Sequence, residues 1–109
     1  TNSATLGKST TSFTTDNQVS NTGQYTSGGG ALTNGGTSLS TNTAIIDFAD
    51  RSFTGVTLTA RGALIYNDTA SGDPAVCVLD FGGDKSASSG TFTIQFPAFT
   101  SSAAIIRIT

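Results

Sequence analysis

The chain has 109 residues, of which 11% are charged, and its formal net charge is −2. This length fits a single domain, and the charged share is well below the roughly 25% of an average soluble domain. The Lys and Arg residues are scattered along the chain, whereas nucleic-acid binding requires clustered basic side chains, so we expect no nucleic-acid partner. No apolar run approaches the ~20 residues of a membrane span, and we expect no membrane association.

The residue types that carry most enzyme chemistry are scarce. The chain has no His, no Glu and a single cysteine, Cys77, which excludes an intramolecular disulfide and a zinc site. Cys77 lies in an apolar run, where a small buried side chain without an activating base is expected. Asp47 and Asp50 flank residues 48–49, and Asp80 and Asp84 flank residues 81–83. Their spacing lacks the pattern of a calcium loop, and Asp beside Gly is typical of turns. We therefore predict no enzyme and no cofactor.

Residues 1–42 form a compositional unit of their own, dominated by Thr, Ser, Asn and Gly. The runs at 28–30 and 34–36 add the glycines of turns or linkers. Such a segment buries too little apolar surface to offset its own conformational entropy. It is predicted to be an extended arm that becomes ordered only against a foreign surface, and plain disorder is the alternative.

Short strands are expected throughout residues 43–109. Alternating or continuous apolar residues predict strands at 43–48, 56–60, 63–66, 75–81, 91–96 and 103–109. Gly62 marks a bulge or bend between two of them, 67–74 is rich in turn residues, and 82–90 is expected to be a polar loop. The strand at 75–81 is apolar on nearly both faces and is expected at the centre of a sheet. The fold class is therefore all-β: a small antiparallel β-sandwich, jelly-roll-like, or a barrel, with an extended N-terminal arm.

Two kinds of residue are candidates for contacts with other chains. The first is the sparse set of apolar side chains in the arm. The second is an arginine in an apolar strand region, which either points outward with its stem on the surface or forms an ion pair with an Asp of a neighbouring chain. The candidate interface residues are Leu6, Phe13, Val19, Tyr25, Leu32, Leu39 and Arg61.

Three segments of the second part of the chain carry a resemblance to a known group. They read TARGALIYND at 59–68, AVCVLDFGGDK at 75–85 and GTFTIQFP at 90–97. This part, from about residue 43 to residue 109, resembles small virion proteins of tailed bacteriophages, of the capsid decoration (cement) type. The resemblance implies a structural protein made in the host cytoplasm and placed on the outer surface of the virion capsid. It also implies the major capsid protein as partner and a homo-oligomer, for which we expect a trimer, and it carries no catalytic residues.

A second reading is a glycan- or receptor-binding module of a phage head or tail fibre. β-Sandwiches often present loops for such binding, and here these would be 67–74 and 82–90. Against this reading, the chain has no Trp and only two Tyr, the rings that suit carbohydrate best.

Overall fold

The computed structural model describes residues 1–108 and contains five β-strands and no helix in that range. The strands are β1 (Asn34–Ser40), β2 (Thr43–Phe48), β3 (Arg51–Tyr66), β4 (Ala75–Ile94) and β5 (Ile106–Ile108). They form two antiparallel sheets: a small sheet in the order β1-β2-β5, and a ribbon of the two long strands β3 and β4. The predicted all-β class with antiparallel pairing is confirmed, and two sheets fit the predicted small β-sandwich.

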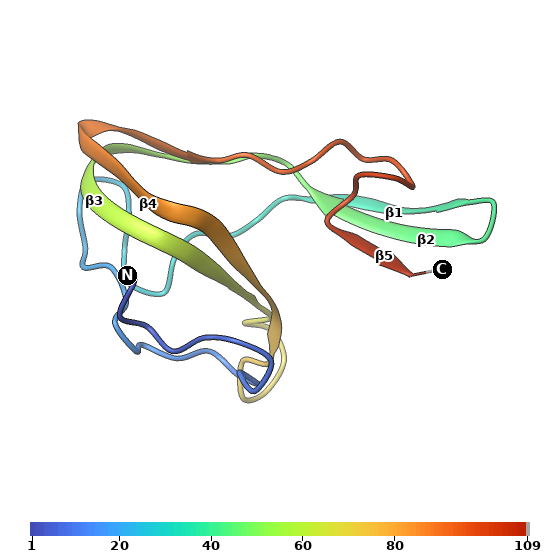
Figure 1. The fold of residues 1–109 in the computed structure, drawn as a ribbon, viewed down its shortest axis with the longest axis horizontal. Coiled ribbons are helices and arrows are strands. Elements are labelled where there is room, and N and C mark those ends of the chain that lie inside the picture. The colour runs from blue at the N-terminus through green and yellow to red at the C-terminus, as the bar shows by residue number, and fades with distance from the viewer. Residues whose placement is uncertain (109) are drawn as a thin grey trace.

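Figure 1 shows how the parts are arranged along the long axis of the molecule. The ribbon occupies one half, and the small sheet extends from it into the other half. The N-terminal segment, residues 1–33, contains no strand and loops beside the ribbon. The principal extents are 43 × 28 × 26 Å.

The ribbon is one long antiparallel pair that begins with Arg51 opposite Ile94 and ends with Tyr66 opposite Ala75. The two strands predicted at 56–60 and 63–66 are parts of β3, and the predicted irregularity at Gly62 is confirmed as a register shift between Ala60 and Gly62. A Cβ at Gly62 would meet the carbonyl oxygen of Leu79, so the close approach of the strands requires glycine here.

The predicted polar loop at 82–90 is wrong, because this segment belongs to β4. Its hydroxyl side chains bond across the ribbon: the Oγ atoms of Thr59 and Ser86 lie 2.8 Å apart, and β3 and β4 are paired along this stretch. Gly82 (φ 76°) and Ser89 (φ 48°) have positive φ angles, which allow the irregular pairing of segment 82–90 within β4. The expected central position of 75–81 is also wrong, because β4 has one strand neighbour, β3.

The core is small and lies on one face of the ribbon. Phe53, Val56, Leu58 and Ala60 of β3 are buried, with Val56 fully enclosed. Between them lie exposed residues, the alternation of a strand with one covered face. Val19 and Tyr25 of the N-terminal segment pack against this cluster, and the ring of Tyr25 meets Phe53 edge-on at 5.4 Å between centroids.

The N-terminal segment is therefore ordered against the chain's own ribbon, which corrects the expectation that only a foreign surface fixes it. Backbone hydrogen bonds tie it down at separate points: Ala75 N–H donates to the Thr11 carbonyl (3.0 Å), and Gln24 N–H donates to the Thr54 carbonyl (3.0 Å). The Tyr66 hydroxyl donates to the Gly28 carbonyl at 2.7 Å. This segment has too few apolar side chains to be held by burial alone, so hydrogen bonds to the ribbon hold it in place.

The boundary predicted after residue 42 also differs from the structure. The last part of the predicted arm is β1, which pairs with β2 through a hairpin, so residues 34–42 belong to the small sheet. The glycines at 35 and 36, predicted to belong to a turn or linker, lie in a strand with a register shift between Asn34 and Thr37.

The C-terminal strand is shorter than predicted. Of residues 103–109, Ile106–Ile108 form β5 at the edge of the small sheet, and Thr109 lies outside the described residues. Ile108 is 68% exposed at this edge. Ala104, in the turn before β5, is buried instead.

Replacing Phe53 by Ala tests whether this small cluster is the main source of stability. Phe53 is 6% exposed, and its loss should lower the free energy of unfolding by about 3–5 kcal/mol, the usual cost of Phe→Ala in a core. Chemical denaturation measures this value. Val76→Ala is the control, because Val76 is 47% exposed and should change stability by much less. Equal losses in the two variants would contradict the assignment of the core.

Replacing Gly23 by Ala tests the attachment of the N-terminal segment. Gly23 has a positive φ, and a Cβ there would collide with the backbone at Thr54 and Gly55. The variant should release the hydrogen bonds between this turn and β3. We expect faster amide hydrogen exchange at Gln24 and Tyr25 with the β3–β4 ladder still protected. Gly29→Ala controls for backbone strain alone, because Gly29 also has a positive φ but has open space around the position of a Cβ.

Candidate interaction surface

A groove of about 1320 Å³ lies between the ribbon, the N-terminal segment and the small sheet. Its walls are rich in apolar side chains, which come from all three parts of the fold. The ribbon and the residues after it supply, among others, Leu58, Leu64, Val78, Phe81, Phe92 and Phe96, and the small sheet supplies Ile46, Phe48 and Ile106. Most of these side chains are only half-buried, because no further element of the described chain fills the groove.

The accessible surface of the molecule supports the same point. It measures 6708 Å² for a chain of 11.0 kDa. A compact monomer of this mass exposes about 5,600 Å², so roughly 1,100 Å² more is exposed than the size requires. A protein partner in a standard interface covers about 800 Å² on each side. The excess is thus of the size that one partner would cover.

The structure places six of the seven predicted interface residues in the walls of this groove. They are Leu6, Phe13, Val19, Tyr25, Leu32 and Arg61. Their contacts are with the chain's own body, as in the ring contact of Phe13 with Tyr66 at 4.5 Å between centroids. The seventh, Leu39, lies on β1 with 70% of its surface exposed. Whether these residues meet another chain stays a prediction.

No sequence pattern indicated the groove residues of β4 and the small sheet. The alternation of Phe92, Ile94 and Phe96 was recognised, and the structure confirms that they are more buried than their neighbours. The alternation predicts a strand with one covered face, without saying what covers it. Nothing in the alternation itself distinguishes a filled core from an open groove.

The outer edge of β4 is a second open feature. β3 is its one strand neighbour, and among residues 1–108 the backbone hydrogen bonds outside the ladders reach β4 only at Ala75. Its middle carries Asp80, Asp84 and Lys85, and charges of this kind discourage pairing with another strand. The stretch 75–79 is apolar, and the N-terminal segment occupies its beginning: Ala75 N–H donates to Thr11, and Gly7, Lys8 and Thr10 line a pocket together with residues 75–78. An added strand would therefore fit only beyond Ala75.

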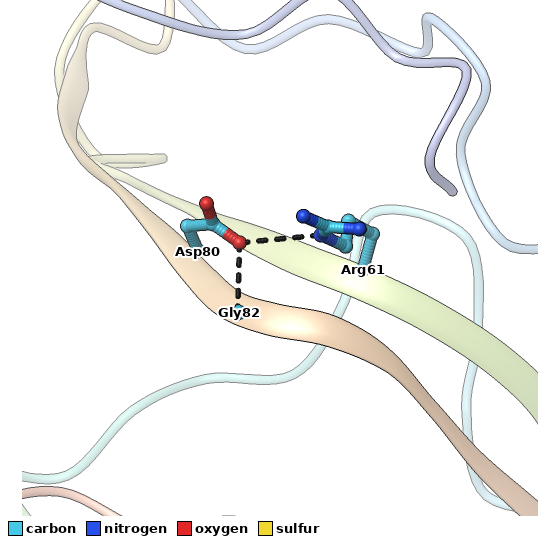
Figure 2. Close-up of polar contacts among 3 residues, drawn as sticks. All are labelled: Arg61, Asp80 and Gly82. Carbon is cyan, nitrogen blue, oxygen red and sulfur yellow. Dashed lines mark hydrogen bonds and ion pairs between the residues drawn. The ribbon is translucent and has the colours of Figure 1, made fainter.

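Arg61 forms its ion pair within the chain, across the ribbon (Figure 2). Its Nε donates to Oδ1 of Asp80 at 3.4 Å, and the same oxygen accepts a hydrogen bond from Gly82 N–H at 2.9 Å. The Gly82 amide, and after it Arg61, lowers the pKa of the Asp80 carboxyl below its ordinary value of 3.8. Both side chains are largely exposed, so the pair orders the strand locally and contributes little to stability.

The lowered pKa of Asp80 predicts a sign for the pH dependence. Because the folded state favours the carboxylate, Asp80 stabilises the fold above its ordinary pKa, and this contribution is lost as the pH falls through the lower folded value. Asp80→Asn should therefore show a smaller loss of stability on acidification than the wild type, with Asp84→Asn as the control. Denaturant midpoints measured from neutral to acidic pH give this difference. A carboxyl titration of Asp80 at or above the ordinary value would contradict the prediction.

Residues 1–108 contain no cluster of three or more His, Cys, Asp or Glu that could hold a metal ion. Cys77 is half-buried, and burial raises the pKa of its thiol, which lowers the thiolate fraction at neutral pH. No helix within the described range is long and apolar enough to cross a membrane.

Of the two loops considered for ligand binding, one is present. The connection at 67–74 is a turn-rich loop in which Asn67 Oδ1 accepts hydrogen bonds from Thr69 and Ala70 N–H groups. It contains no aromatic residue. The other, 82–90, is strand.

Comparison of the chain with protein-family models, with curated proteins and with solved structures finds no match.

Proposed function

We propose that this chain is a structural virion protein that binds and stabilises a phage capsid shell, with the major capsid protein as its partner. The observation that carries the proposal is the unfilled apolar groove, together with the open edge of β4. The resemblance of residues 43–109 to capsid decoration proteins supplies the class of partner.

The groove supports a protein partner rather than a small ligand. Its volume of about 1320 Å³ exceeds the roughly 300–1,000 Å³ of ordinary small-molecule pockets. Its apolar side chains come from every part of the fold, so a partner that enters it would also brace the ribbon against the small sheet. An extended segment of a capsid subunit could add backbone hydrogen bonds at the edge of β4 and place side chains in the groove.

Weak single contacts suffice for such a role. A shell presents many copies of the same site, and an oligomeric protein that engages several of them gains affinity without a new contact. The proposal therefore includes a homo-oligomer, a trimer by the resemblance, located on the outer surface of the capsid.

The glycan-binding alternative receives less support. It depended on two loops, of which only 67–74 exists, and that loop lacks the aromatic side chains on which sugars stack.

The test is binding of the purified chain to expanded empty capsids of the phage that encodes it. We expect saturation at a fixed ratio to the capsid subunits and a higher melting temperature of the shell. Val76→Asp places a charge at the open edge of β4, in the groove wall, and should weaken binding at least about tenfold, or 1.4 kcal/mol. Ser88→Asp, exposed on β4 and outside the groove lining, is the matched control.

Two results would overturn the proposal. Capsids that bind no chain, or only a few copies per particle, would remove the decoration role. Equal binding by Val76→Asp and Ser88→Asp would show that the groove is not the docking site.

A further inference from the structure

One face of the small sheet is apolar and uncovered, and the strand register defines it. Leu39, Ala44 and Ile108 lie side by side across the three strands. Two residues further along each strand, Thr37, Ile46 and Ile106 lie side by side in the same way. Residues directly opposite each other in antiparallel strands share a face, as do residues two apart along a strand. We call this set of six the apolar face.

The opposite face of the small sheet is covered along β2, although Ser38 and Arg107 on the same face are exposed. Ile45 and Asp47 of β2 are buried there, and Ala104 is buried in the turn that precedes β5. The apolar face differs: Leu39 is 70% and Ile108 68% exposed, Ala44 is exposed, and Ile46 and Ile106 are half-buried. The sheet thus buries Ile45 and Asp47 on one side and leaves Leu39 and Ile108 on the other side to solvent.

The position of the small sheet makes this face accessible to another molecule. In Figure 1 the β1–β2 hairpin and β5 extend away from the ribbon at one end of the molecule. Ile46 and Ile106 also line the end of the groove, whereas Leu39, Ala44 and Ile108 lie beyond it. A partner on the apolar face would therefore close that end of the groove as well.

We infer that the apolar face packs against the same face of further copies of this chain. None of its six residues is charged, so bringing identical faces together opposes no like charges and buries no unpaired charge. Two such sheets stacked face to face would make a sandwich about 10 Å thick, with aliphatic side chains between them. The excess exposed surface of roughly 1,100 Å² is shared between this face and the groove, which meet at Ile46 and Ile106, so another copy on the face would cover part of it.

This inference assigns a contact surface to the homo-oligomer of the proposed function, but it does not require capsid binding, because it concerns the isolated chain. Direct packing of two faces gives a dimer across a two-fold axis, and three faces around a three-fold axis give a trimer. In both cases the occupant of the face is another copy.

The experiment is the molar mass of the purified chain, measured by light scattering after gel filtration and by sedimentation over a range of concentrations. The wild type should form an oligomer with a mass two or three times 11.0 kDa. Leu39→Asp and Ile108→Asp should each raise the dissociation constant at least about tenfold, because each copy loses a buried aliphatic group and gains a charge to desolvate.

Ser38→Asp is the matched control. Ser38 is the exposed neighbour of Leu39 on β1, but it lies opposite Ile45 and so faces the other side of the sheet. It should leave the oligomer unchanged. Leu39→Thr and Ile108→Thr place a β-branched residue that suits a strand and add no charge. They serve if an Asp variant fails to fold, as judged by circular dichroism.

A wild type that stays monomeric at high concentration would overturn the inference. So would oligomers that persist in the folded Leu39 and Ile108 variants, or that dissociate equally in Ser38→Asp. Since no capsid is present, none of these outcomes depends on whether the chain binds a shell.

Discussion

The antiparallel pairing of β3 with β4 is the interaction on which the rest of the molecule depends. It joins the two longest strands, and the core cluster lies on one of its faces. A two-stranded sheet is marginal in water unless something covers a face. Here Val19 and Tyr25 provide that cover at one end, so the ribbon and the N-terminal segment stabilise each other. Neither would keep its shape without the other.

This cover is incomplete, and the open surface follows from it. The N-terminal segment reaches the ribbon through separate hydrogen bonds and a few rings, since its Thr, Ser and Gly residues have little apolar surface to bury. Between these points the side chains of Val78, Phe92 and Phe96 line an open groove. A polar segment can fix the backbone of a ribbon, but it cannot fill a core.

The sequence predicts the strands well where alternation is strong and poorly where polar residues pair. The strand at 43–48, the irregularity at Gly62 and the turns at 67–74 follow from local patterns, and all three are in the structure. The strand at 82–90 does not follow from a local pattern. Its Ser86 forms a hydrogen bond with Thr59 across the ribbon, and the two residues are far apart in the chain. The N-terminal segment was likewise misplaced because its partners, Thr54 and Tyr66, are distant in sequence. For the candidate site, composition identified Leu6, Phe13 and other sparse apolar residues that line the groove, but no local pattern shows that a groove stays open.

The small sheet shows most clearly why association suits this fold. Its covered face includes Asp47, which is 2% exposed, and although its Oδ1 accepts the Phe48 N–H, its Oδ2 has no hydrogen-bond partner among residues 1–108. A buried polar atom without a partner costs about 1–3 kcal/mol. The sheet must offset this cost with three short strands, while Leu39 and Ile108 on the other face contribute almost nothing as long as they face water. Covering the apolar face would convert those side chains into buried ones and brace β5, the shortest strand, at the edge of the sheet. The same contact would close one end of the groove, so association of copies and docking of a partner would reinforce each other.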